Sequence, residues 1–249
     1  SSHGGGIRSH LANFNHEEKI CDHKVVWCRP FHESHVQLPA NKLMNKEIIN
    51  SSKELLTVIG FELPRFSYRI QSGPISSLMI EHFQQQERLL ENIADGVISK
   101  LNFRPHAYDS WGSARSISRK FGSQSISKGK TIYDDFAISR LIICTYPMTT
   151  FSEAMTSNIP TILLLNGHTW ELAPMFNELV KELEEAQIII SDPVKAASHI
   201  NKYWSAPDDW WERADVRSAR SSYLLQCTGM QHNMASPLLS WKRFFNDLM

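Results

Sequence analysis

From residue 55 onward, short apolar runs alternate with segments whose apolar residues recur at helical spacing. This alternation predicts strands joined by helical crossovers, the pattern of a parallel sheet covered by helices on both faces. We therefore expect an α/β fold with a doubly wound parallel sheet. The predicted strands are 55–61, 97–103, 141–144, 161–165 and 188–190. The predicted helices are 76–93, 114–120, 132–138, 151–156, 174–185, 193–204, 208–226 and 237–248.

The first 50 residues lack this regular pattern. They are rich in histidine and polar residues, and their one short apolar run, 24–27, predicts an edge strand. The chain begins at Ser1 rather than at a methionine, and a cluster of glycines follows at once. We therefore expect residues 1–50 to be a partial N-terminal domain with a linker and exposed apolar edges. Residues 51–230 are expected to form the sheet domain, and residues 231–249 a C-terminal helix that packs back.

Charge and composition argue against several classes of protein. The 26 basic and 26 acidic residues give no net charge, whereas a protein that binds nucleic acid through phosphates normally has a basic excess. No apolar run approaches the roughly 20 residues that cross a bilayer. The four cysteines have neither a paired metal spacing nor a dense disulfide pattern, which favours reduced thiols in a cytoplasm.

The segment after the strand at 141–144 carries the strongest candidate site. In an open parallel sheet, ligands bind beyond the carboxyl ends of the strands, and here Thr149, Thr150 and Glu153 follow such an end. Thr149 and Thr150 are expected to cap the start of a helix, whose free amides and dipole suit a phosphate. Glu153, one turn further, could accept hydrogen bonds from a ribose. The alternative is a structural capping box, in which Glu153 bonds back to the cap amide of Thr150.

Two other clusters of polar residues have structural alternatives. Cys21, His23, Cys28, His32 and His35 contain metal-ligating types, but their spacing fits no common zinc finger, so we expect no metal site. A basic stretch is expected to be either a solvated face or a loop over donor phosphates. Its residues are Arg115, Arg119, Lys120, Lys128 and Lys130.

The order of three motifs resembles glycosyltransferases built from two facing Rossmann-like domains, the GT-B arrangement. A strand, a Ser/Thr turn, a short helix with Glu153 and a strand led by Pro160 resemble their donor-binding half. His3 with the three following glycines resembles the His-Gly loop of the CDP-glycerol glycerophosphotransferase-like and capsule-polymerase enzymes, where the histidine acts as the base. Arg104, Pro105 and His106 resemble the element that meets the donor phosphate there.

A closer resemblance extends over most of the chain, to a bacterial transferase family whose genes lie in surface-polysaccharide and nonulosonic-acid loci. The chain departs from that family's pattern at Cys28 and Arg29, which replace Gly-Trp, and at Tyr108 to Trp111, which replaces an Asp-Tyr-Gly-Trp-like segment. The resemblance rests on the glycine loop at His3, Glu17, Asp22, Trp27, Arg65, Tyr68, 104–111, 145–160, Ala196, Ala197, Trp210, Trp211, Ala219 and Arg220.

These resemblances imply transfer from a nucleotide sugar to an acceptor hydroxyl in surface-polysaccharide biosynthesis, without a metal or other cofactor. His3 would deprotonate the acceptor, while Arg104, His106 and the helix start at Thr149 and Thr150 would hold the phosphates. Two alternatives remain open: a non-catalytic nucleotide-sugar-binding module, and a sugar epimerase of the same architecture.

The expected acceptor is a glycan or a lipid-linked glycan. The chain is then expected in the cytoplasm, and association with the inner face of the membrane through the apolar face of the last helix is an alternative. That face carries Leu238, Leu239, Phe245 and Leu248, with Lys242 and Arg243 as its basic residues.

Overall fold

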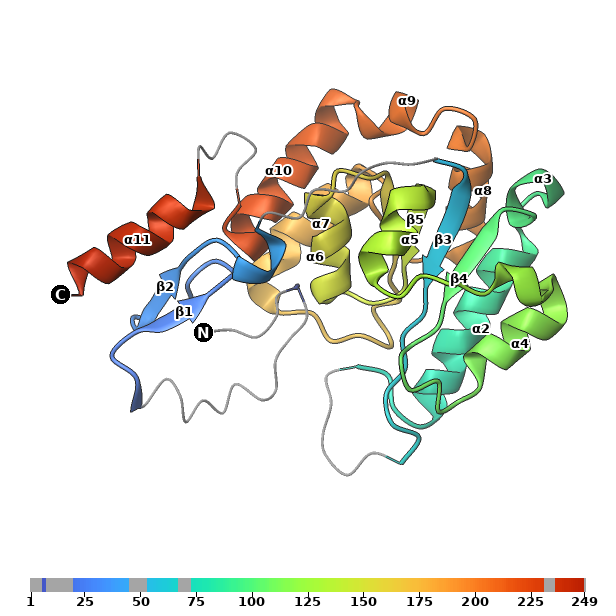
Figure 1. The fold of residues 1–249 in the computed structure, drawn as a ribbon, viewed down its shortest axis with the longest axis horizontal. Coiled ribbons are helices and arrows are strands. Elements are labelled where there is room, and N and C mark those ends of the chain that lie inside the picture. The colour runs from blue at the N-terminus through green and yellow to red at the C-terminus, as the bar shows by residue number, and fades with distance from the viewer. Residues whose placement is uncertain (1–5, 8–19, 45–52, 67–72, 231–235, 249) are drawn as a thin grey trace.

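Five parallel strands form the central sheet of the computed structural model, in the order β4-β3-β5-β6-β7 (Figure 1). The structure describes residues 6–7, 20–44, 53–66, 73–230 and 236–248. The sheet strands are β3 (Leu55–Ile59), β4 (Leu101–Arg104), β5 (Ser139–Cys144), β6 (Thr161–Leu164) and β7 (Ile189–Ile190). The expected α/β fold with a parallel sheet is confirmed.

The strands read as nearly continuous apolar runs because helices cover both faces of the sheet. In β5, the residues from Leu141 to Cys144 are all fully buried, and in β3 the residues Leu56 and Val58 are as well. The polar exceptions are satisfied within the core: the Thr57 hydroxyl lies 2.6 Å from that of Ser139 and accepts a hydrogen bond from Asn102. The buried core therefore follows the strands that the sequence predicts.

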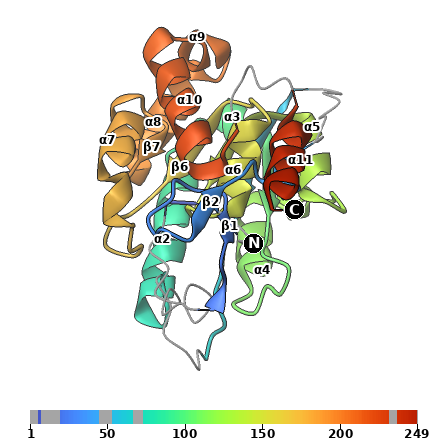
Figure 2. The same cartoon turned by 90° about the vertical axis from the view of Figure 1, so that its left-hand side faces the viewer.

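Helices pack on the two faces as right-handed crossovers require. α2 packs against α8, and α10 packs against α6 and α7 (Figures 1 and 2). The α-helices are α2 (Ser77–Glu91), α3 (Asp95–Ile98), α4 (Ser113–Phe121), α5 (Ile132–Ile138), α6 (Thr149–Thr156), α7 (Asn177–Glu185), α8 (Pro193–Tyr203), α9 (Asp208–Trp211), α10 (Ala214–Thr228) and α11 (Pro237–Asp247). The 3-10 helices are η2 (Asn41–Leu43), η3 (Ser123–Ser125) and η4 (Pro174–Phe176).

Several predicted bounds differ from the observed ones by one or two residues, such as the helix start predicted at 151 that lies at Thr149, and two elements were predicted wrongly. The strand predicted at 97–103 starts only at Leu101, because Val97 and Ile98 belong to the single turn α3, which is too short to show a helical period. The helix predicted at 208–226 is divided into α9 and α10. The adjacent indoles of Trp210 and Trp211 at the end of α9 are both buried, and they donate to the Ala186 carbonyl and to Asn158.

A second, small sheet lies outside the main one. The predicted edge strand is present as β1 (Lys24–Val26), and it pairs in parallel with β2 (His35–Gln37), which was not predicted. Figures 1 and 2 show α11 at the same end of the molecule, where the Trp241 indole donates to the Pro39 carbonyl at 2.9 Å. No residue of α11 is buried, and its ring contact of Phe244 with His23, at 6.2 Å between centroids, also joins it to residues 20–44.

Within the described ranges, no helix is both long enough and apolar enough to span a bilayer.

Candidate functional site

One pocket of about 410 Å³ lies where β3, β4 and β5 reach their carboxyl ends. Its volume falls within the range of small-molecule sites. The backbone of Gly60 forms part of its wall directly after β3. The pocket is lined by Lys42, Ile59, Gly60, Arg104, Pro105, His106, Ala107, Thr131, Ile132, Tyr133, Tyr146, Thr150 and Glu153.

Four of the predicted site residues line this pocket together: Arg104, His106, Thr150 and Glu153. Thr149 is not among the lining residues. Helical spacing does not separate the two threonines, because Thr149 and Thr150 lie four and three positions before Glu153 on α6, and both spacings bring residues onto one face. His3 lies outside the described residues.

Glu153 is 3% exposed, yet its carboxylate has two partners within the pocket. Its Oε1 accepts a hydrogen bond from the Tyr133 hydroxyl at 3.0 Å and lies 3.1 Å from the Lys42 ammonium. The alternative of a capping box at Thr150 and Glu153 is wrong, because the N-cap residue of α6 is Met148 and no side chain caps it.

The expected capping by Thr149 and Thr150 is also wrong. Both threonines are helical residues of the first turn of α6. Neither occupies the N-cap position, from which a side-chain hydroxyl bonds to the free amides. The Thr150 hydroxyl instead accepts a hydrogen bond from the Tyr146 hydroxyl at 2.6 Å. Among the described residues, no side-chain hydrogen bond caps the start of α6, which lies at the pocket.

The Arg104 guanidinium is bonded to two backbone carbonyls and to a buried carboxylate. Its Nη1 donates to the carbonyls of Gly129 and Thr131 at 3.1 and 3.0 Å and to Asp135 Oδ2 at 2.5 Å. Asp135 is 1% exposed, and its Oδ1 accepts further hydrogen bonds from Asn102 and Ser127. Arg104 therefore ties the end of β4 to the loop that carries Lys128 and Lys130, at the rim of the pocket.

An aromatic wall adjoins the polar part of the pocket. The ring of Phe61, directly beyond β3, lies 4.8 Å from that of Tyr146 and 6.2 Å from that of His106. Burial raises the pKa of Tyr146 far above its ordinary value, and desolvation followed by the charge of Glu153 does the same for Tyr133. Both phenols therefore keep their protons and act as hydrogen-bond donors.

The glycine-rich N-terminal segment ends against this site. A Cβ atom on Gly6 would meet the Pro147 carbonyl oxygen at 2.3 Å, so only a glycine allows this approach to the loop before α6. The next residue, Ile7, is fully buried, and its carbonyl accepts a hydrogen bond from the Ala173 amide. The described end of this segment therefore lies beside the loop that joins β5 to α6.

Lys42, Tyr133 and Tyr146 line the pocket but were not among the predicted site residues. Tyr146 belongs to the polar segment after β5, which was a visible signal. Thr131 and Asp134, which form a capping box at the start of α5, were a second sequence signal, for the helix whose first turn contains Tyr133. Lys42 comes from η2, outside the main sheet, and nothing in its sequence surroundings pointed to this pocket.

Other residues of the family resemblance have packing roles. The Trp211 indole and the Arg220 guanidinium both donate to Asn158 Oδ1, and Arg220 lies over the Trp211 ring at 4.3 Å. Arg65 lies 5.3 Å from the centroid of Trp111. Glu17 and Tyr68 lie outside the described residues.

The cysteine- and histidine-rich stretch contains Cys21, His23, Cys28, His32 and His35. Over the ranges that the structure describes, no three His, Cys, Asp or Glu side chains are grouped so that they could hold a metal ion. His32 there bonds to the Ser34 hydroxyl at 2.8 Å.

Comparison with known proteins identifies a family. The model described as "LIC12162 family transferase" matches residues 1–245. No curated protein matches the chain. Two structures of the wall teichoic acid polymerase TagF, soaked with CDPG for 30 and 15 minutes, are similar at 11% identity with TM-scores of 0.45 and 0.47. The alignments cover 95% of this chain but only 59% and 58% of TagF, and a similarity this low assigns no function.

Proposed function

This chain belongs to the LIC12162 family of transferases, and from that membership we propose that it transfers a glycosyl group from a nucleotide sugar to an acceptor hydroxyl. The proposed setting is surface-polysaccharide biosynthesis in the cytoplasm, with a glycan or a lipid-linked glycan as the acceptor. The observation that carries the proposal is that Arg104, His106, Thr150 and Glu153 line one pocket together, at the carboxyl ends of β3, β4 and β5.

In the proposed arrangement the donor ribose lies against Glu153, and the phosphates lie between the start of α6 and the loop that Arg104 holds. The carboxylate of Glu153 suits the two hydroxyls of a ribose, because it only accepts hydrogen bonds when ionised. The amides at the start of α6 and the basic residues of the 128–130 loop would stabilise the charge that develops on the leaving phosphate.

The transfer step needs a base and a leaving group. In the proposal, His3 takes the proton of the acceptor hydroxyl as its oxygen forms a bond to the anomeric carbon. The bond from that carbon to the phosphate oxygen breaks, and the electron pair leaves with the nucleotide. His106, which lines the pocket, would donate a hydrogen bond to the leaving phosphate.

We also propose that the molecule follows the GT-B arrangement. The five-stranded sheet would be the donor half, and residues 20–44 with α11 would belong to the facing half. Support comes from the separate β1–β2 pair, since a two-stranded sheet is only marginally stable alone. Large apolar side chains are also exposed at this end of the molecule, namely Ile20, Phe31, Leu238, Leu239, Phe245 and Leu248.

The test combines calorimetry, using a panel of CMP-, CDP-, UDP- and GDP-sugars, with a transfer assay on the complete protein. Glu153→Ala should weaken donor binding by about 1–3 kcal/mol, the value of a hydrogen-bonded charge. His3→Ala should leave donor binding nearly intact and slow transfer by about 10²–10⁴-fold, because a general base acts in the transition state.

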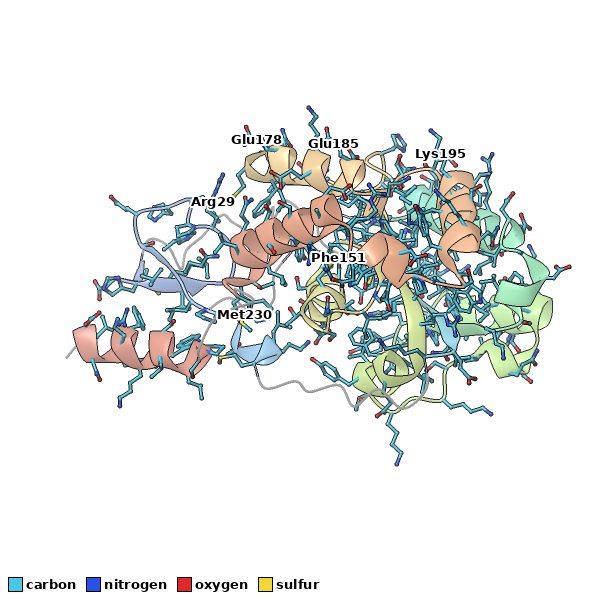
Figure 3. All side chains as sticks on the ribbon, turned by 90° about the horizontal axis from the view of Figure 1, so that it is seen from above. Arg29, Phe151, Glu178, Glu185, Lys195 and Met230 are labelled. Atoms are coloured by element: carbon cyan, nitrogen blue, oxygen red, sulfur yellow. The ribbon has the colours of Figure 1, made fainter. Side chains whose placement is uncertain are left out.

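Matched controls are Glu178→Ala, on the outer side of α7 (Figure 3), and His168→Ala, in an exposed loop. Neither should change binding or turnover. Unchanged turnover of His3→Ala would remove His3 as the base. Donor binding without any transfer would favour the binding module, and no binding of any nucleotide sugar would refute the whole proposal.

A further inference from the structure

Lys42 reaches the pocket from outside the five-stranded sheet. Its backbone in η2 is fixed, because Leu43 is buried with Trp27 and Ala40 and the Ala40 amide donates to the Thr228 carbonyl at 2.9 Å. Its side chain is 52% exposed and ends 3.1 Å from Glu153 Oε1. A fixed backbone with a long, half-exposed stem lets the ammonium change partners while its anchor stays in place.

The charges of the pocket are not equally available to a ligand. Arg104 is committed to Asp135, a buried carboxylate with two further hydrogen-bond donors on it. Lys42 is the other cation among the described lining residues, and its partner Glu153 is already supported by Tyr133. When Lys42 leaves, its half-exposed ammonium regains water and Tyr133 still donates to Glu153, and both effects lower the cost of the exchange.

The Lys42 ammonium is paired with the Glu153 carboxylate, to which the ribose is proposed to bind. A donor therefore has to displace it, and the displaced charge needs a new partner in the same pocket. The phosphates of the donor supply one, because each carries a negative charge and accepts hydrogen bonds from an ammonium.

We propose that Lys42 is a donor-phosphate ligand that holds Glu153 only while the pocket is empty. Binding of a nucleoside diphosphate group moves the ammonium from Glu153 to a phosphate oxygen and frees the carboxylate for the ribose. This inference rests on the proposed function. It makes the pocket selective for phosphorylated nucleosides, since a nucleoside alone displaces Lys42 without giving it a new partner.

Lys42→Met tests the exchange by calorimetry with three matched pairs: cytidine and CDP, uridine and UDP, and guanosine and GDP. For the pair that the unaltered protein prefers, the affinity for the diphosphate should fall about 10- to 100-fold, as expected for one charge-assisted hydrogen bond. The affinity for the nucleoside should rise about 2- to 5-fold, because Glu153 no longer has a competing partner.

Lys42→Arg should keep the diphosphate affinity within a few-fold of the original. Lys195→Met, on the exposed side of α8 (Figure 3), should change neither affinity. Circular dichroism should show unaltered folding, because the Lys42 side chain is half exposed.

The opposite signs of the two changes are what the inference requires. If Lys42→Met leaves the diphosphate affinity unchanged, or raises both affinities, Lys42 is no phosphate ligand and the inference is overturned while the proposed function stands. If the nucleoside affinity falls, Lys42 does not compete with the ribose, which also overturns it. If the unaltered protein binds neither member of any pair, the inference is overturned, and the panel of nucleotide sugars alone decides the proposed function.

Discussion

Replacing Asp135 by asparagine should destabilise the protein substantially. The side chain is 1% exposed, and its carboxylate accepts hydrogen bonds from Asn102 at 3.0 Å, Ser127 at 2.6 Å and Arg104 at 2.5 Å. An asparagine has the same shape but turns one acceptor into a donor. That donor must face either Arg104 or the pair of Asn102 and Ser127, so at least one buried donor loses its acceptor.

The magnitude follows from the burial of the ion pair. Removing one partner of a buried pair costs about 3–5 kcal/mol, and Arg104, with 23% of its side chain exposed, retains some hydration, so we expect about 3 kcal/mol. For a chain of this size the midpoint of thermal unfolding should then fall by about 6–12 °C. Because the 127–131 loop loses its anchor, the affinity for a nucleotide sugar should fall as well.

The measurement is urea and thermal unfolding followed by circular dichroism at pH 7. Asp247→Asn, on the exposed last turn of α11, is the matched control and should leave stability unchanged. A loss below about 1 kcal/mol for Asp135→Asn, the value of an exposed pair, would show that the network is not a stabilising unit.

Two further predictions concern His82 and Gly6. Burial lowers the pKa of His82 to about 4, so its contribution to stability is complete above the ordinary value of 6.5 and is lost as the pH falls from there towards 4. Between pH 7.5 and 4.5, the free energy of unfolding measured in urea should therefore fall by about 2–3 kcal/mol less in His82→Phe than in the unaltered protein. An equal fall in the two proteins would contradict this. Gly6→Ala should cost about 1–3 kcal/mol in the same assay through the clash with Pro147, whereas Gly96→Ala, with no atom within 4 Å of the added carbon, should be neutral or stabilising; equal effects would refute the packing argument.

Much of the fold followed from patterns that are local in the chain. The helix at 132–138 has the predicted bounds, and each of the five predicted sheet strands is present in the predicted order along the chain. Apolar runs and helical periods report on burial directly, because a strand buried on both faces or an amphipathic helix must show them. Short elements such as α3 and β2 escape this reasoning, since a helix of four residues or a strand of three is too short for its period to repeat.

The candidate pocket could be predicted in part for a similar reason. The carboxyl ends of parallel strands meet at one edge of the sheet, so residues as distant in sequence as Arg104 and Glu153 were expected together, and they line one pocket. Their functional roles stay predictions.

Only the tertiary structure decided which partners these side chains have. Glu153 bonds to Tyr133 and Lys42 rather than to its own helix cap, and Arg104 bonds to Asp135. No sequence pattern contains these pairs, because they depend on the direction in which each side chain leaves its helix or strand and on which acceptor then lies within about 3 Å. The sequence determined that polar residues would gather at the end of the sheet, and three-dimensional packing determined which of them hold one another.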